Sequence, residues 1–380
     1  MNFVWVSPYA PQDRKGGWRS FSHHLLLALE ELLGPSCRVA PVYVREDWRK
    51  KWISRIQKHL GIPRAYTYFS RTRLERYRRQ LQTRIPDSNQ KPLIFFGALP
   101  FVAYVPRAPY FIVSDGSFHI NYHDYNQDHS HDPADINRIC EAEAGFLRRS
   151  AGVLLTSRFA ADRIRRDYGI SGSLLDVVGI GPGNVPPPPA KVGCGDFVLS
   201  VLADFARKQG RFAFECVAAA RSRGIAVRLK FIGDKPPRDI LNADFVEYAG
   251  WLDLDREPDR DRFRTELSCC LALMLPSRAD LTPHVIPEAS LYSKATIAAA
   301  VGGIPEMIRD GETGLLFSPE EGPEQVAERL GRFFRDRSRL REMGSAAHQW
   351  YQESWNWPKV AGRIIEHVKR ALPNDLHGHF

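Results

Sequence analysis

Short apolar segments alternate with longer amphipathic ones along most of the chain, and this pattern predicts an α/β fold. The short segments are rich in Val, Ile, Leu and Phe, and Gly, Pro, Ser or Asp bound them, as is typical of buried strands. They cover residues 2–8, 37–44, 92–99, 109–115, 151–157, 175–181, 197–202, 227–234, 245–251, 271–277, 294–301 and 313–319. Helical patterns lie between several of them, for example at 18–33, 134–151 and 211–224.

A segment rich in Pro and Gly, residues 182–195, interrupts this pattern and cannot hold a helix or a central strand. We therefore expect two doubly wound parallel sheets joined by a linker. The expected division is an N-terminal domain at 1–185, a linker at 186–195, a C-terminal domain at 196–357, and a helix at 358–380 that crosses back to the N-terminal domain. Such folds bind ligands at the carboxyl ends of their strands and in the cleft between domains.

Length and composition agree with two folded domains. The chain has 380 residues, of which 43% are apolar, and this suffices for two hydrophobic cores. The N-terminus lacks the pattern of a secretion signal, and no run reaches the ~18 apolar residues of a membrane span. Six cysteines are scattered without CxxC spacing, so we expect reduced core thiols rather than disulfides or a zinc site. These features predict a cytoplasmic protein.

Nearly all of the net charge of +9 lies in one segment, residues 45–84. It holds thirteen Lys or Arg against three acids, so the rest of the chain is close to neutral. Trp48, Trp52 and Ile56 recur there at helical spacing between basic residues, a pattern suited to an anionic membrane surface. A solvated helix that packs on its own domain fits the same pattern, so both interpretations stay open. No RNP, KH or zinc-finger pattern is present, and nucleic acid is not an expected partner.

Two carboxylates bracket the loop that follows the segment 271–277. Asp280 stands just past the expected strand, and Glu288 follows with seven residues between them. Pro287 suits the first position of a helix, which would place Glu288 in the first turn near backbone amides. Such a loop can bind a ligand that carries both sugar hydroxyls and phosphates. An alternative, in which both acids only cap local structure, stays open at this point.

Two other loops between strands and helices carry residues suited to a phosphate ligand. Arg207 and Lys208 follow the segment 197–202, where an Arg fork and a Lys point charge can meet phosphate oxygens. Gly16 and Gly17 follow the first expected strand and allow the backbone to come close to a ligand.

Residues 276–320 resemble the nucleotide-sugar-binding signature of glycosyltransferase family 4, whose members are retaining enzymes of the GT-B architecture. The similarity covers much of 197–357, including 339–357, and extends more weakly to 15–33 and 147–164. The resemblance therefore implies a GT-B type fold, in which two Rossmann-like domains face each other across a cleft.

The resemblance also implies roles for the acid pair. The family pattern has two glutamates with the spacing seen here, and Glu288 matches the second, which holds the donor ribose. Asp280 stands at the first, which contacts hydroxyls of the donor sugar. Aspartate keeps the charge of glutamate but is one methylene shorter, so this position departs from the family pattern.

Other residues match the family pattern as well. Lys208 matches the lysine that neutralises the donor diphosphate, Arg207 is placed to share that task, and Gly302 and Gly303 match a Gly-Gly turn. Many members carry a histidine at the end of the fourth N-terminal strand. Asp115 stands there instead, with His119 close by on the acceptor side.

The implied function is a retaining, metal-independent hexosyltransferase that needs no cofactor and uses a nucleotide-diphospho-sugar as co-substrate. The acceptor would be a carbohydrate or a lipid-linked or polysaccharide precursor, and the segment 45–84 would hold the enzyme at the inner face of the membrane as a peripheral protein. Two alternatives stay open: a nucleotide-sugar epimerase or hydrolase of the same fold, and a non-catalytic GT-B scaffold protein.

Two stretches contain residue types that bind metals but lack a metal-site spacing. Aspartates in D-x-D spacing occur at Asp253 and Asp255 and again at Asp259 and Asp261, in a charged loop where we expect capping and solvation. Residues 119–132 are rich in His and Asp without a helical pair or a repeated spacing. We expect a polar loop there rather than a metal site.

Overall fold

The computed structural model describes residues 3–14, 16–34, 37–41, 64–86, 88–125, 130–189 and 195–372, and for 37–41 the backbone alone. Twelve strands form in these residues, one inside each segment that the apolar pattern predicts. They are β1 (Phe3–Ser7), β2 (Cys37–Pro41), β3 (Leu93–Phe96), β4 (Tyr110–Ser114), β5 (Gly152–Leu155), β6 (Leu175–Val177), β7 (Phe197–Leu202), β8 (Arg228–Gly233), β9 (Val246–Tyr248), β10 (Ala272–Leu275), β11 (Ala295–Ala299) and β12 (Gly314–Phe317).

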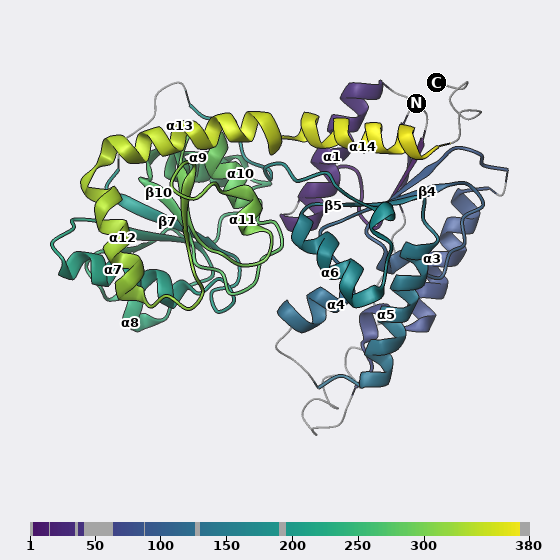
Figure 1. Cartoon of the computed structure of the whole chain (residues 1–380), viewed down its shortest axis with the longest axis horizontal. Helices are drawn as coiled ribbons and strands as arrows, with labels where there is room; N and C mark the ends of the chain where they lie inside the picture. The colour runs from purple at the N-terminus through teal and green to yellow at the C-terminus, as the bar shows by residue number, and fades with distance from the viewer. Residues whose placement is uncertain are drawn as a thin grey trace. The chain divides into compact units, whose positions relative to one another are not determined.

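Helices connect most of the strands, as Figure 1 shows. They are α1 (Gly17–Leu33), α3 (Arg71–Arg84), α4 (Phe118–Ile120), α5 (Pro133–Arg148), α6 (Arg158–Tyr168), α7 (Gly210–Ser222), α8 (Arg238–Leu241), α9 (Glu257–Cys269), α10 (Val285–Leu291), α11 (Ile304–Met307), α12 (Pro323–Arg335), α13 (Arg337–Ser354) and α14 (Trp357–Ala371).

The strands form two six-stranded sheets, and every pair of neighbouring strands is parallel. The first sheet has the order β2-β1-β3-β4-β5-β6, and the second has the order β12-β11-β10-β7-β8-β9. Both orders are doubly wound, because the connections run outward in both directions from one point within each sheet. That point lies between β1 and β3 in the first sheet and between β10 and β7 in the second.

Contacts divide the chain into two compact units, one around each sheet. The first comprises Met1–Asp13, Ser22–Gly179 and Val360–Phe380, and the second comprises Arg14–Phe21 and Ile180–Lys359. The loop with Gly16 and Gly17 thus belongs to the second unit, although it follows the first strand of the first.

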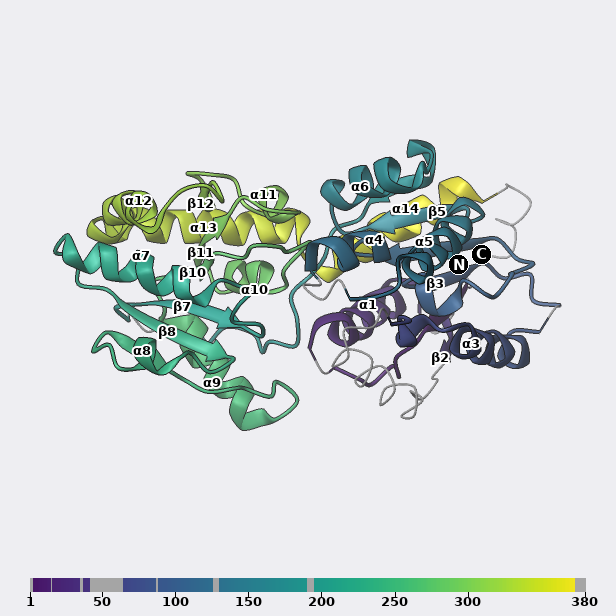
Figure 2. The same ribbon diagram turned by 90° about the horizontal axis from the view of Figure 1, so that it is seen from below.

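Helices cover both faces of the second sheet. In Figure 2, α7, α12 and α13 lie on one side of it, and α8 and α9 lie on the other. The side chains of Met274, Val217 and Leu330 belong to one core that joins β10 to α7 and α12. All four residues of β10 are buried, which is expected of a parallel strand covered on both faces.

The C-terminal helix α14 contributes to the core of the first unit. Val360, Ile364 and Val368 recur at helical spacing and are fully buried. His367 Nδ1 lies 2.8 Å from a carboxylate oxygen of Asp176 in β6, so a polar contact accompanies the apolar one.

The basic segment is described only in part. Trp48, Trp52 and Ile56 lie outside the described residues. Helix α3 buries Leu74, Tyr77 and Leu81 in the first unit. Its exposed residues include Arg71, Arg76, Arg79 and Arg84. Within the described ranges, the helices are all too short or too polar to cross a bilayer.

Candidate functional site

The reversal of strand order in the second sheet brings two loops together. β7 and β10 are neighbours in the sheet, although two strands separate them in sequence. Residues 203–209 follow β7 and residues 276–284 follow β10. The amide of Arg278 donates to the carbonyl of Arg207 over 2.9 Å, which ties the two loops. Doubly wound sheets bind their ligands at this position.

Lys208 and Asp280, one from each loop, form a buried ion pair. Lys208 Nζ donates to Asp280 Oδ2 over 2.5 Å, and Ser277 Oγ donates to the same oxygen over 3.0 Å. Arg207 Nη1 lies 3.7 Å from that oxygen and donates to the carbonyl of Ala279 over 2.7 Å. Lys208 and Asp280 are only 8% and 9% exposed. The structure thus brings together three residues that the sequence singles out.

Gly302 fixes the position of the Asp280 backbone. Its φ of +57° lies in the left-handed region, and a Cβ atom there would stand 1.8 Å from the carbonyl oxygen of Asp280. The amide of Gly303 donates to that same oxygen over 3.3 Å. The Gly-Gly turn therefore packs directly beneath the loop that carries Asp280, and no larger residue fits at position 302.

Glu288 is buried in helix α10, and its side chain forms a hydrogen bond with a residue outside that helix. Oε1 accepts from the amide of Gly183, 105 positions earlier in the chain, over 3.0 Å. A Cβ on Gly183 would stand 2.5 Å from that oxygen, so the contact requires glycine. Burial raises the pKa of Glu288 to about 7. Because Glu288 and Asp280 both bind distant groups, the interpretation in which they only cap local structure is wrong.

The prediction that Pro287 occupies the first helical position is also wrong. Helix α10 begins at Val285, two residues earlier, and His284 is its N-cap. Glu288 still lies in the first turn, as predicted. The helix begins early because the amide of Ile286 already bonds to the carbonyl of Pro283, which closes a turn before Pro287.

His284 is a site residue that the sequence reasoning missed. Burial lowers its pKa to about 4, and the charge of Lys208 acts in the same direction. The ring is therefore neutral at physiological pH. Nδ1 lies 2.9 Å from the carbonyl oxygen of Gly181, which can only accept, so Nδ1 carries the proton and Nε2 is an acceptor. The signal available in sequence was its place between Asp280 and Glu288.

The glycines of the N-terminal loop adopt a left-handed backbone. Gly16 and Gly17 have φ of +47° and +51°, and Cβ atoms on them would meet nothing within 4 Å. The expected close approach of a ligand to this backbone stays a prediction.

Asp115 and His119 lie in the first unit, past the carboxyl end of β4. His119 Nδ1 is 3.2 Å from Asp167 Oδ2, and its amide donates to the hydroxyl of Tyr168 over 3.2 Å. That hydroxyl donates over 2.6 Å to Glu143, which is buried and also accepts from the amide of Phe118 over 2.7 Å. Burial raises the pKa of Glu143 to about 7. A buried network therefore holds the turn that carries His119.

The loop with the paired aspartates is held by caps. Asp253 Oδ1 accepts from the amide of Asp255 over 3.1 Å, and Asp259 accepts from the amide of Asp253 over 3.1 Å. In the part of the chain that the structure describes, no three His, Cys, Asp or Glu side chains are grouped so as to hold a metal ion. His129 of the histidine-rich stretch lies outside that part.

Residues 197–336, which carry the whole second sheet, match the model of the family described as glycosyl transferases group 1. A stretch of 115 residues is 32% identical to alpha-maltose-1-phosphate synthase of Mycolicibacterium smegmatis, over 29% of this chain and 30% of that protein. A longer stretch of 243 residues is 26% identical to D-inositol 3-phosphate glycosyltransferase of Rhodococcus jostii, over 58% of this chain and 52% of that protein. The chain thus matches at most about half of these two relatives. The resemblance to glycosyltransferase family 4 is confirmed over the matched residues.

Solved structures share the fold over nearly the whole chain. Sucrose-phosphate synthase from Thermosynechococcus elongatus superposes with a TM-score of 0.69 at 17% identity and covers 97% of this chain and 99% of its own. HepE from Anabaena, in complex with UDP, superposes with a TM-score of 0.67 at 14% identity and covers 97% and 100%. The expected fold of two Rossmann-like domains of the GT-B type is confirmed.

Proposed function

We propose that this protein is a glycosyltransferase that moves a sugar from a nucleotide-diphospho-sugar to an acceptor. The observation that carries the proposal is the buried pair of Lys208 and Asp280, with Arg207 beside it, at the point where the second sheet reverses its strand order. The pair lies in the part of the chain that matches glycosyl transferases group 1. The pair places cations beside a carboxylate that can accept from hydroxyls. A sugar diphosphate carries both phosphates and hydroxyls and so matches this arrangement.

Lys208 and Arg207 act on the leaving group. Negative charge grows on the diphosphate as its bond to the sugar breaks, and cations held in place beforehand stabilise that charge without reorganising. Arg207 is held by the Ala279 carbonyl and Lys208 by Asp280, so both are oriented before the donor binds. We propose that these residues suffice without a metal ion and that the donor is a co-substrate rather than a bound cofactor.

The two carboxylates bind different parts of the donor. The bonds of Asp280 to Lys208 and Ser277 go to Oδ2, so Oδ1 is the atom placed to accept from a sugar hydroxyl. Glu288 binds the ribose hydroxyls in its ionised form. Since donor binding favours that form, the pKa of Glu288 falls when the nucleotide binds.

The reaction retains the configuration at the anomeric carbon. In this proposal the acceptor attacks from the face that the diphosphate leaves, and the leaving phosphate takes the acceptor's proton, so the protein needs no nucleophile. Asp115 orients a hydroxyl of the donor or acceptor, and His119 lies on the acceptor side. Backbone groups around Gly16 and Gly17 contribute to donor binding.

The first donors to test are UDP-sugars, because the structures of Anabaena HepE contain UDP and UDP-glucose. The acceptor is a lipid-linked or polysaccharide precursor, and the exposed arginines of α3 hold the enzyme at an anionic membrane surface as a peripheral protein of the cytoplasmic face. The support for this location is the charge of the helix alone.

Release of free nucleotide that depends on an added acceptor tests the proposed activity. A transferase releases nucleotide diphosphate and forms a glycosylated acceptor in equal amounts. A hydrolase would release nucleotide without an acceptor, an epimerase would alter the sugar without releasing nucleotide, and a scaffold protein would do neither. The named relatives are transferases and a synthase, so these alternatives are not favoured. The proposal is wrong if a panel of nucleotide-sugars and acceptors gives no acceptor-dependent release.

A further inference from the structure

A pocket opens in the second unit at the opposite ends of the strands from Lys208 and Asp280. Gly195 precedes β7, Leu271 precedes β10 and Lys294 precedes β11, and all three line it. The pocket therefore stands at the amino ends of the strands whose carboxyl ends carry the candidate donor site. The length of these strands sets the two sites about 15–20 Å apart.

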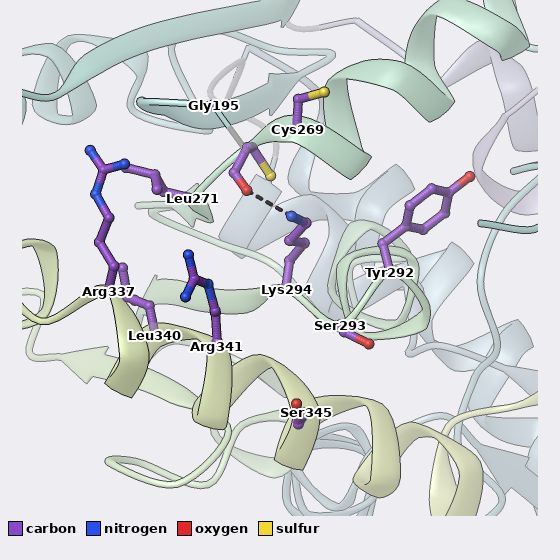
Figure 3. A pocket seen from close by; sticks show the side chains of 11 residues that line it. Gly195, Cys269, Leu271, Tyr292, Ser293, Lys294, Arg337, Leu340, Arg341 and Ser345 are labelled. Carbon is purple, nitrogen blue, oxygen red and sulfur yellow. Dashed lines mark hydrogen bonds between the residues drawn. The ribbon is translucent and has the colours of Figure 1, made fainter. Parts of the chain in front are cut away.

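Three cations and no carboxylate occur among the described residues that line this pocket. Figure 3 shows Arg337 and Arg341 rising from α13 toward the strand ends, with Arg341 between Arg337 and Lys294. Positions 337 and 341, together with Ser345, recur every four residues, so one face of α13 forms the wall. The volume is about 370 Å³, at the lower end of the range for small-molecule sites.

Asp196, Glu266 and Asp336, on elements that border the pocket, bind other groups. Asp196, next to Gly195, binds Arg228 over 2.7 Å, although the charge of Arg337 also helps to lower its pKa. Glu266 of α9 binds Lys230 over 2.9 Å. Asp336 caps α13 by accepting from two of its amides. None of these three acids is among the described residues that line the pocket.

The walls are held in place before any ligand binds. Lys294 Nζ donates to the carbonyl of Cys270 over 2.9 Å, as Figure 3 also shows. A Cβ on Gly344 would stand 2.1 Å from the carbonyl oxygen of Ser293, so α13 packs tightly on the turn that carries Lys294. Leu340 is 5% exposed and forms the apolar floor.

We propose that this pocket binds a small phosphate monoester, of the size of a hexose monophosphate, as a second site apart from the donor. Arginine forks bind phosphate oxygens in pairs, and the lysine adds a point charge. The apolar floor and the hydroxyls of Ser293 and Ser345 suit the carbon frame and hydroxyls of a sugar. The ligand would join α13 to the amino ends of β10 and β11 and so stabilise the second unit.

Thermal unfolding at constant ionic strength tests the site, with inorganic phosphate, a hexose monophosphate and the uncharged hexose as probes. Because the donor site also attracts phosphate, each titration is repeated in a Lys208→Ala background. We expect a saturable rise in Tm with the hexose monophosphate, a weaker one with phosphate and none with the uncharged sugar. Arg337→Gln and Arg341→Gln should each weaken the apparent affinity by on the order of tenfold.

Arg339→Gln is the matched control, because Arg339 lies on the same helix but pairs with Glu342 and the carbonyl of Gly311. It should leave the affinity unchanged. The proposal is overturned if the Tm rise vanishes in Lys208→Ala, if it persists in the Arg337 and Arg341 variants, or if Arg339→Gln weakens it equally. None of these outcomes depends on sugar transfer, so a failed transferase assay leaves the result standing.

Discussion

Lys208 Nζ and Asp280 Oδ2 lie 2.5 Å apart, although 72 positions separate the two residues in the chain. The cation proposed to bind the diphosphate thus already holds the carboxylate proposed to bind the sugar. In the proposed site, a phosphate that draws on Lys208 would weaken this pair and make Asp280 a better acceptor for sugar hydroxyls.

Lys208→Ala should lower kcat/KM for sugar transfer by the equivalent of about 2 to 4 kcal/mol, as expected for loss of one charge donor aimed at the transition state. Asp280 keeps its hydrogen bond from Ser277 and the charge of Arg207, 3.7 Å away, so the fold should persist. Steady-state kinetics and circular dichroism check both points. Lys230→Ala is the control, because Lys230 pairs with Glu266 elsewhere in the second unit. Near-normal transfer in the Lys208 variant would remove that residue from the mechanism.

Glu288→Gln and Asp280→Asn should have separable effects. The first should weaken the binding of nucleotide diphosphate, because an amide offers one acceptor oxygen where a carboxylate offers two. The second should leave nucleotide affinity close to that of the wild type and lower kcat for sugar transfer. Isothermal titration with nucleotide diphosphate, followed by transfer assays, separates the two. If both variants bind and transfer normally, the two acids are structural.

The raised pKa of Glu288 predicts that stability falls as pH rises. The folded value is about 7 and the usual value is 4.5, so between these limits the folded state holds more protons than the unfolded chain. The free energy of unfolding must then decrease with rising pH across that window, by about 1.4 kcal/mol for each unit of pKa difference. Glu288→Gln should remove this part of the slope, as measured by urea denaturation at several pH values.

Glu143→Gln is the matched control, because burial also raises the pKa of Glu143 to about 7, but in the first unit. It should remove a similar part of the slope while nucleotide affinity stays unchanged. In the wild type, nucleotide affinity should rise toward pH 7 more steeply than in Glu288→Gln, since only the wild type must release that proton. If nucleotide affinity depends on pH equally in the wild type and in Glu288→Gln, the proposed contact of Glu288 with the ribose is contradicted.

Gly302→Ala should damage both stability and nucleotide binding. An added Cβ would stand 1.8 Å from the Asp280 carbonyl, so the loop with the carboxylate must move. Gly311→Ala is the control: its φ of +75° is strained for alanine, but its Cβ would meet nothing within 4 Å. The control should lose about 1–2 kcal/mol of stability and keep full nucleotide affinity. If Gly302→Ala and Gly311→Ala change nucleotide affinity equally, Gly302 matters only for its backbone conformation and not for the position of Asp280.

Replacing Arg71, Arg76, Arg79 and Arg84 of α3 by Gln should weaken sedimentation with anionic liposomes. Each basic residue near such a surface contributes about 1 kcal/mol at low salt. The control changes four exposed arginines of the second unit, Arg211, Arg256, Arg332 and Arg339. Membrane association through α3 is refuted if the wild type ignores anionic liposomes, or if both variants bind them equally.

The strands could be predicted from sequence because each parallel strand is a compact apolar run between polar loops. Asp280 and Lys208 could be proposed because each stands in a polar loop just after an apolar strand segment and lies in the part of the chain that resembles the family pattern. The contact of Glu288 with Gly183 could not, since it joins positions 105 apart and depends on how the chain enters the second unit. His284 was missed because burial, which keeps its ring neutral, is a property of the folded loop.

The assignment of Val360–Phe380 to the first unit has a consequence for biosynthesis. Domains generally fold in the order in which the ribosome releases them. Here the first unit lacks α14, with its buried Val360, Ile364 and Val368, until the entire second unit has been translated. Until then, the apolar surface that α14 covers in the first unit stays exposed. We therefore expect a fragment ending at Gly179 to need a chaperone more than any other part of the chain.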